Sequence, residues 1–151
     1  MSEAVVAQTP AVDDAPLAAD RVRASFARQR FMQYLGAELD EVGEGVCTIS
    51  CRPRPELGQQ HGYVHAGAVA AIADSAAGYA ALSLMPAGSE VLTVEYKLNL
   101  MAPATGDLLV ARGRVLRAGR TLTVAEATVG ALSEGVETPC AALLSTLIRR
   151  S

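Results

Sequence analysis

The segment from Val64 to Met85 constrains this chain more than any other, because it predicts a buried helix that carries one carboxylate. Alanine dominates the predicted helix over residues 66–84, and only a protonated His65 would add a charge to that of Asp74. Desolvating a charge is expensive, so a carboxylate on such a helix needs a partner or a function. Asp74 is therefore the first candidate for a functional residue.

The residues just before this helix form a polar loop that begins at Gln59 and contains Gly62. Such a loop places backbone N–H groups at the helix N-terminus, where they stabilise developing negative charge. A helix start that favours an anion, followed by a lone aspartate, indicates hydrolysis or acyl transfer.

Composition narrows the class of protein. The 151 residues suit one domain, and the net charge of −3 argues against nucleic-acid binding. The sequence contains no run of eighteen apolar residues, so no membrane-spanning helix is predicted, and the N-terminus lacks the features of a signal peptide. The three cysteines show no CxxC spacing, which favours reduced core residues over disulfides or a zinc site. We therefore expect a cytoplasmic protein.

The order of the predicted elements indicates an α+β domain. We expect a disordered tail over residues 1–19 and a single domain over residues 20–151. One helix is predicted from an N-cap at Asp20 to a terminator at Gly36, then a strand or hairpin arm over residues 37–52 with a turn at Gly43 and Gly45. Four strands follow the alanine-rich helix, and a loop is predicted over residues 133–139. The expected strands cover residues 90–100, 106–117, 121–131 and 140–149. Their short connections predict an antiparallel sheet, counted as five strands in all.

Several motifs, in order, match one known family. Gln59, Gly62, the triplet His65-Ala66-Gly67 and Asp74 have the family's spacing. Residues 92–97, the pair Pro103-Ala104 and residues 113–121 extend the match. The chain thus resembles the hotdog-fold acyl-CoA thioesterases, in the branch of the phenylacetate-pathway and 4-hydroxybenzoyl-CoA enzymes. The resemblance implies a curved antiparallel sheet wrapped around one long central helix. It also implies a homodimer or homotetramer with active sites at the dimer interface.

The resemblance also implies roles for five residues. The backbone N–H of Ala66, where the family usually has glycine, would bind the thioester carbonyl. Asp74 of the opposite subunit would act as nucleophile or as general base, and the sequence leaves both open. Gln59 would orient the water or the carbonyl, and Thr93 would hydrogen-bond the water or Asp74. For His65 an orienting role is favoured over a catalytic one.

The substrate implied by the resemblance is an acyl-CoA, whose acyl group the sequence leaves open. Gly67 and Gly78 are expected at the substrate site, and Arg117 and Arg120 are candidates to contact the coenzyme A phosphates. Because the coenzyme A thiolate is a good leaving group, no cofactor or metal is expected. A non-catalytic acyl-CoA-binding protein is one alternative. An enoyl-thioester hydratase is less favoured, because it would need a histidine after Asp74 and the chain has none there.

Overall fold

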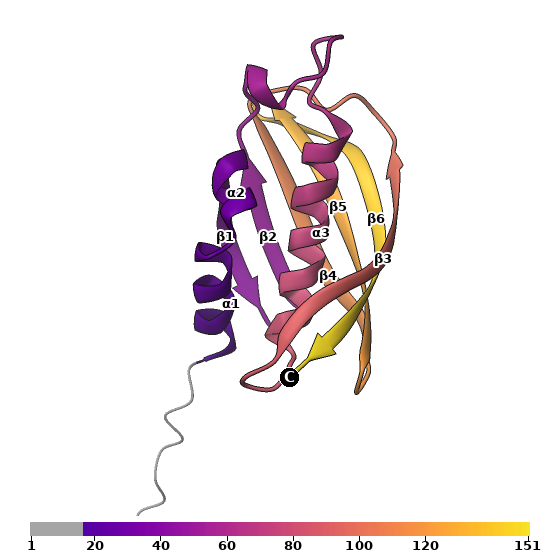
Figure 1. Ribbon diagram of the computed structural model, residues 1–151. Helices are drawn as coiled ribbons and strands as arrows, with labels where there is room; N and C mark the ends of the chain where they lie inside the picture. The colour runs from indigo at the N-terminus through magenta and orange to yellow at the C-terminus, as the bar shows by residue number, and fades with distance from the viewer. Residues whose placement is uncertain (1–16) are drawn as a thin grey trace, which may run out of the picture.

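A computed structural model describes residues 17–151 as one long helix held by a curved sheet (Figure 1). Most of the tail predicted over residues 1–19 lies outside the described residues. Its last two residues, Ala18 and Ala19, belong to the first helix instead. None of the described helices is long and apolar enough to cross a membrane.

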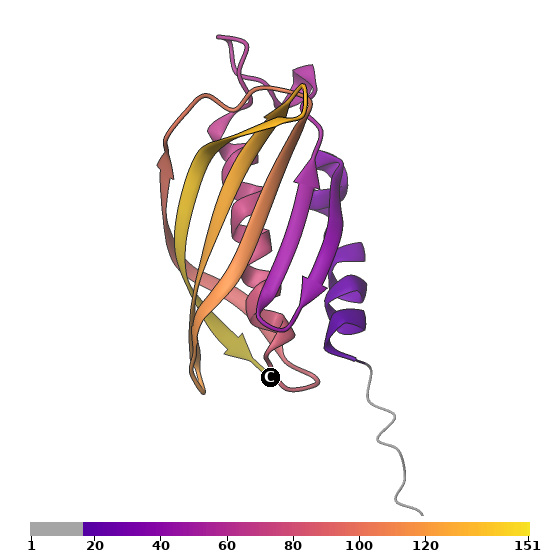
Figure 2. The ribbon, with the colours of Figure 1, turned by 180° about the vertical axis from the view of Figure 1, so that it is seen from behind.

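The sheet has six strands, and every pair of neighbours is antiparallel. They are β1 (Ala37–Gly43), β2 (Val46–Cys51), β3 (Glu90–Leu100), β4 (Leu108–Ala118), β5 (Leu122–Ser133) and β6 (Val136–Arg150). The order across the sheet is β1-β2-β4-β5-β6-β3. Helix α3 (Ala66–Ser83) crosses one face, and Figure 2 shows the opposite face of the sheet. The predicted α+β hotdog architecture is confirmed.

The count of five strands was wrong, because the turn at Gly43 and Gly45 separates two complete strands. Gly45 has the positive φ of 72° that a tight turn requires. The loop predicted over residues 133–139 was also wrong. Glu134 and Gly135 close a tight turn with positive φ, and β6 begins at Val136. Pro139 fits within β6 because it lies at a register shift opposite Gly130, where a ladder hydrogen bond is dispensable.

The single helix predicted between Asp20 and Gly36 was likewise wrong. The chain forms α1 (Ala18–Ala27) and α2 (Arg30–Leu35), and Gln29 between them is extended. Asp20 lies in the first turn of α1 rather than at its N-cap, where its charge still complements the helix dipole. Gly36 ends α2 in the left-handed conformation with φ of 69°, as predicted.

Helix α3 lies very close to β4, at Gly113. A Cβ atom built at this glycine would lie 2.3 Å from the carbonyl carbon and oxygen of Ala76. The small residues of α3 and this glycine therefore set the depth at which the helix sits on the sheet.

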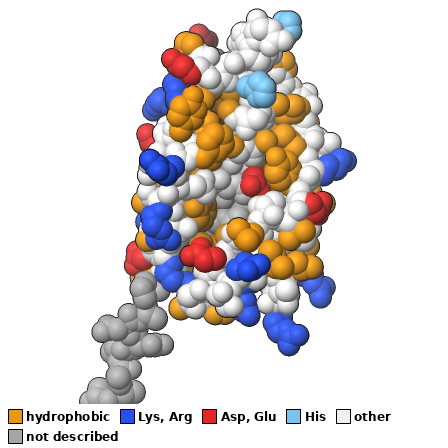
Figure 3. Space-filling model, in the orientation of Figure 1, with side chains coloured by type: hydrophobic (Ala, Val, Ile, Leu, Met, Phe, Trp, Pro, Cys, Tyr) orange, Lys and Arg blue, Asp and Glu red, His pale blue; other side chains and the backbone are white. Residues whose placement is uncertain are grey.

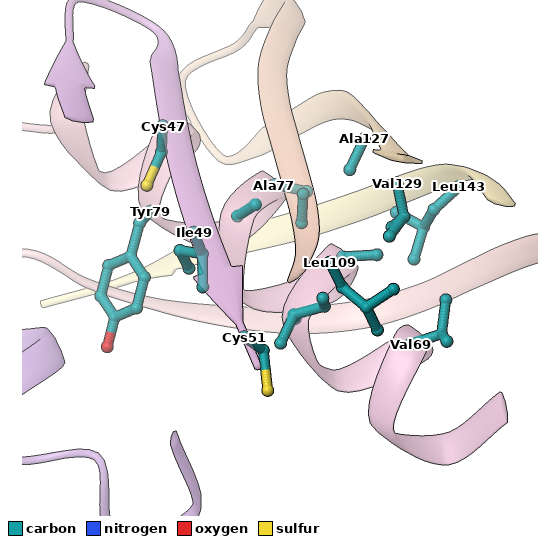
Figure 4. Packing of buried hydrophobic residues seen from close by; sticks show 14 of the residues in the cluster. Cys47, Ile49, Cys51, Val69, Ala77, Tyr79, Leu109, Ala127, Val129 and Leu143 are labelled. Carbon is teal, nitrogen blue, oxygen red and sulfur yellow. The ribbon is translucent and has the colours of Figure 1, made fainter. Parts of the chain in front are cut away.

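The rest of the core is also made of small and medium-sized side chains (Figure 4), and its three buried cysteines are free. Burial raises the pKa of the Cys47 thiol to about 12, so this thiol is inert at neutral pH.

Candidate active site

The loop before α3 is fixed by backbone hydrogen bonds to three parts of the chain. The N–H of His65 donates to the carbonyl of Leu57 at 2.7 Å, and the N–H of Val64 donates to that of Ala104 at 3.0 Å. Within the loop, the N–H of Gln59 donates to the carbonyl of Tyr63 at 2.8 Å. The start of α3 is therefore held in one position relative to the sheet.

His65 is the N-cap of α3. Its Nδ1 accepts a hydrogen bond from the N–H of Gly67 at 2.8 Å, and its carbonyl accepts one from the N–H of Ala68 at 3.0 Å. Within residues 17–151, the N–H of Ala66 has no such acceptor, so it is one of the orphan donors of a helix start. This leaves the donor that the resemblance assigns to the oxyanion free to bind a ligand, while His65 shapes the turn.

Gln59 and Ala66 lie on the same cavity. The Oε1 atom of Gln59 accepts a hydrogen bond from the backbone N–H of His61, which folds this side chain onto its own loop. The cavity has a volume of about 580 Å³, and its walls include Tyr63 of the loop and Met101 beyond the end of β3. The structure thus brings together three of the predicted site residues, Gln59, His65 and Ala66, at the positive end of α3.

Asp74 lies two turns further along α3, on a second cavity of about 440 Å³. The Oγ1 atom of Thr93 on β3 donates a hydrogen bond to Oδ1 of Asp74 at 2.8 Å. Burial raises the pKa of the Asp74 carboxyl group, and the hydrogen bond from Thr93 lowers it in part. Gly78, one turn after Asp74, lines the same cavity.

Within one chain the predicted site residues are divided rather than gathered. The Ala66 cavity and the Asp74 cavity have no lining residue in common. Arg117 and Arg120 lie at the exposed β4–β5 hairpin and line neither cavity. Gly67 lines neither one, and its N–H is already bound to His65.

Sequence reasoning missed the polar side chains at the far end of the Asp74 cavity. Gln29, between α1 and α2, donates from Nε2 to the hydroxyl of Tyr79 at 3.1 Å. Its Oε1 accepts from the hydroxyl of Ser75 at 3.3 Å. A glutamine among arginines is typical of an exposed helix face, so its position offered no signal. Tyr79 offered a weak one, as the only aromatic residue of α3.

Within residues 17–151, no cluster of three or more His, Cys, Asp or Glu residues is placed to bind a metal ion.

Comparisons with known proteins show the family of this chain. Residues 61–137 match the family described as the Thioesterase superfamily. A provisionally named esterase of Halobacterium salinarum is 30% identical over 121 residues, which cover 77% of this chain and 80% of that protein. The crystal structure of a thioesterase family protein from Silicibacter pomeroyi is 45% identical with a TM-score of 0.86, and the match covers 87% of this chain and 97% of that one.

A more distant structure shares the fold alone. The PaaI protein of the E. coli phenylacetic acid degradation operon is 20% identical, with a TM-score of 0.78 over 89% of this chain and 94% of that one. With the family match, the two relatives and the six-stranded sheet around α3, the chain belongs to the thioesterase superfamily and has its hotdog fold.

Proposed function

We propose that this protein hydrolyses a coenzyme A thioester to a free acid and coenzyme A. The hydrogen-bonded pair of Thr93 and Asp74 supports this function most directly, because it holds a carboxylate at a cavity in a thioesterase fold. A half-buried carboxylate with a raised pKa is a typical general base or nucleophile.

In the proposed reaction, the thioester carbonyl oxygen accepts a hydrogen bond from the N–H of Ala66. Ionised Asp74 then removes a proton from a water that attacks the carbonyl carbon, or attacks this carbon itself. The C–S bond breaks, and the thiolate of coenzyme A leaves and takes up a proton. In the second route, water then hydrolyses the acyl-enzyme anhydride and regenerates the carboxylate.

This reaction requires groups from two chains. Eight residues of α-helix separate Ala66 from Asp74, which is a rise of about 12 Å. One carbonyl group cannot contact both within the same chain. A homodimer that places Ala66 of one chain against Asp74 of the other solves this problem.

The β3 edge of the sheet is the surface that supports such a dimer. Several of its large apolar side chains, with Met101 just beyond the strand, are between 45 and 56% exposed. They are Leu92, Val94, Tyr96, Leu100 and Met101. Figure 3 shows the helix side of the molecule, where hydrophobic side chains lie on both sides of a hollow. The opposite edge, β1, carries Glu38, Asp40 and Glu41, which disfavour pairing with another strand. We therefore propose a homodimer through β3, and a homotetramer as a pair of such dimers.

Three free buried cysteines fit a reducing compartment, so we place the activity in the cytoplasm.

Replacing Asp74 by asparagine tests the assignment. Asp74→Asn keeps the acceptor for Thr93 but removes the base, so turnover of the best acyl-CoA is expected to fall by about 10²-fold or more. Thiol release measures the rate, and Asp107→Asn, at an exposed aspartate in the loop before β4, is the matched control. Normal turnover by a folded Asp74→Asn protein contradicts the assignment.

Mixing two inactive variants tests the two-chain arrangement. A dimer of one Asp74→Asn chain and one Ala66→Pro chain retains one site with both groups intact. After the subunits exchange freely, half of the dimers are of this kind, so about a quarter of the wild-type activity should return. Exchange is followed with a tag on one variant. Mixed dimers without activity would show that both groups act within one chain.

A further inference from the structure

Strand β3 has one edge that pairs with no other strand in the part of the chain that the structure describes (Figure 1). On this strand Tyr96 is paired with Ser145 of β6, which is buried, so the Tyr96 side chain lies on the helix side of the sheet. Successive residues of a strand point to opposite faces. Glu95 and Lys97 therefore lie together on the outer face, where both are exposed.

Glu95 and Lys97 have no ion-pair partner within residues 17–151. Thr146 donates from Oγ1 to Oε1 of Glu95 at 2.6 Å, which holds the carboxylate at the strand edge. Lys97 is the only lysine of the chain. Two arginines of β4 on the same face, by contrast, are paired with glutamates of β5 and β6. One charge of each sign is thus left at the edge where the dimer is proposed to form.

The two-chain site requires two different parts of β3 to lie side by side. Asp74 is hydrogen-bonded to Thr93, near the start of the strand. Ala66 lies on the same cavity as Leu100, at the end of the strand. A thioester that contacts Ala66 of one chain and Asp74 of the other therefore needs Thr93 close to Leu100 of the partner subunit.

Symmetry leaves few ways to meet this requirement. When two copies of a strand pair antiparallel about a two-fold axis perpendicular to the sheet, one residue lies opposite its own copy. The β-bulge of this strand takes up one residue. With the bulge counted, an axis at Tyr96 puts Thr93 opposite Leu98 of the partner subunit. An axis at Lys97 puts it opposite Leu100 of the partner subunit, whereas an axis at Leu98 puts it beyond the end of β3. Only the first two axes suit the site.

The charges on the outer face decide between these two axes. An axis at Lys97 places this side chain directly opposite its own copy, and like charges in that position destabilise a strand pair. An axis at Tyr96 places Glu95 of each chain opposite Lys97 of the partner subunit, which makes two ion pairs in the dimer. It also brings together the two Tyr96 rings, each 45% exposed in the single chain, on the helix side.

We propose that the two β3 strands of the dimer pair with Tyr96 on the two-fold axis, and that the Glu95–Lys97 ion pairs fix this register. The inference rests on the proposed function, because the two-chain site supplies one of its two arguments. Glu95 and Lys97 are then positioning residues, which set the part of the partner chain that faces Asp74. They contact no substrate, since they lie on the face of the sheet opposite α3.

Charge exchange between the strands tests the ion pairs. Lys97→Glu and Glu95→Lys each give a homodimer with two like-charge contacts, so each homodimer should be about tenfold weaker or more in sedimentation. A mixture of the two variants restores two opposite-charge contacts. At a tenfold difference about nine tenths of its dimers should be mixed, rather than the half that random pairing gives. A tag on one variant counts the mixed dimers.

Glu90→Lys is the matched control, because it makes the same change of charge on the same strand. About an axis at Tyr96, Glu90 lies beyond the end of the partner strand. This variant should form homodimers as strong as those of the wild type and should show no preference for Lys97→Glu. A chain with both exchanges, Glu95→Lys and Lys97→Glu, should also recover the strength of the wild-type dimer.

A disulfide reads the register directly. Directly opposite residues of antiparallel strands have Cα atoms about 4.5–5.5 Å apart, within the range that a disulfide spans. Tyr96→Cys should therefore give a covalent dimer in oxidising buffer. Lys97→Cys should not, because its two copies are displaced by two residues, about 6.6 Å along the strands. The three native cysteines are buried and are the same background in both variants.

Thiol release from hexanoyl-CoA and benzoyl-CoA separates the two levels of the argument. The cross-linked Tyr96→Cys dimer should remain active, because Tyr96 lines neither cavity. The inference is overturned if Lys97→Cys cross-links better than Tyr96→Cys, or if the charge variants mix at random. Activity of the wild type beside either result leaves the proposed function intact. Cross-linking at Tyr96 in a protein that hydrolyses neither thioester supports the strand pairing and counts against the proposed function alone.

Discussion

Replacing Gly113 by alanine tests whether the close contact between β4 and α3 positions Asp74. The new Cβ atom would lie 2.3 Å from the carbonyl carbon and oxygen of Ala76, whereas ordinary contacts begin at 3.4 Å. The difference is about 1.1 Å, and the opposing atoms belong to a helix backbone that cannot rotate away. Helix and strand must therefore move apart by about this distance.

The size of both effects follows from this displacement. Overpacking of this kind costs about 1–3 kcal/mol of folding free energy, which lowers Tm by roughly 2–12 °C in a domain of this size. Asp74 lies two residues before Ala76 on the same helix, so its carboxylate moves as well. A misplacement of about 1 Å can cost up to ~10²-fold in rate. We expect Gly113→Ala to lose both stability and turnover.

Gly78→Ala is the matched control for stability. It makes the same chemical change on α3, the other partner of this contact, but its Cβ would meet Leu147 at an ordinary 3.7 Å. Alanine is favoured over glycine in a helix interior, so this variant should gain about 0.5–1 kcal/mol. Calorimetry and thiol release are measured for both variants. Gly113→Ala with the Tm and turnover of the wild type would refute the role given to this contact.

Two further predictions concern the groups that act on the thioester. Because burial raises the pKa of Asp74, kcat/KM should rise with pH through a limb above the ordinary carboxyl value of 3.8. Thr93→Val removes the hydrogen bond that lowers this pKa, so the rising limb of the pH profile should move to higher pH. Thr93→Ser keeps a hydroxyl group and should leave the limb in place. A Thr93→Val profile identical to that of the wild type contradicts a role for the Thr93–Asp74 hydrogen bond. Ala66→Pro removes the N–H donor and should raise the barrier by about 3–4 kcal/mol, whereas Ala66→Gly should cost little. His65 already has φ of −62° and ψ of 138°, which a following proline permits. The circular dichroism spectrum of Ala66→Pro should therefore match that of the wild type. Normal turnover by this variant would exclude the helix start as the oxyanion site.

The elements that sequence predicted well are those with a strong local pattern. The alanine-rich run predicted α3 to within one residue at its end, and a segment rich in Val, Leu and Thr predicted β3 with its observed bounds. The hydrogen bond between Thr93 and Asp74 was one of two contacts implied for Thr93, and the structure shows it within one chain. These residues are far apart in sequence, so only a family resemblance connected them beforehand.

The features that sequence missed depend on tertiary contacts. The break between α1 and α2 has no proline or glycine to mark it, and Gln29 there is held by bonds to α3. The early start of β6 was hidden by Pro139, which local rules assign to a loop and which a register shift accommodates. In both places a contact with another element decided the backbone conformation against the local pattern.

The packing of α3 and the chemistry of Asp74 have one physical origin. Small side chains let the helix lie deep on the sheet, and this depth removes water from the carboxylate and raises its pKa. A raised pKa means that ionising Asp74 costs folding free energy, so its contribution to stability is fully present below the unfolded pKa and is lost as pH rises through the folded value. The ionised state that the reaction needs is thus less favourable in the folded protein than it is for an aspartate in water. Thr93, on the exposed edge strand, offsets part of that cost with one hydrogen bond to the carboxylate.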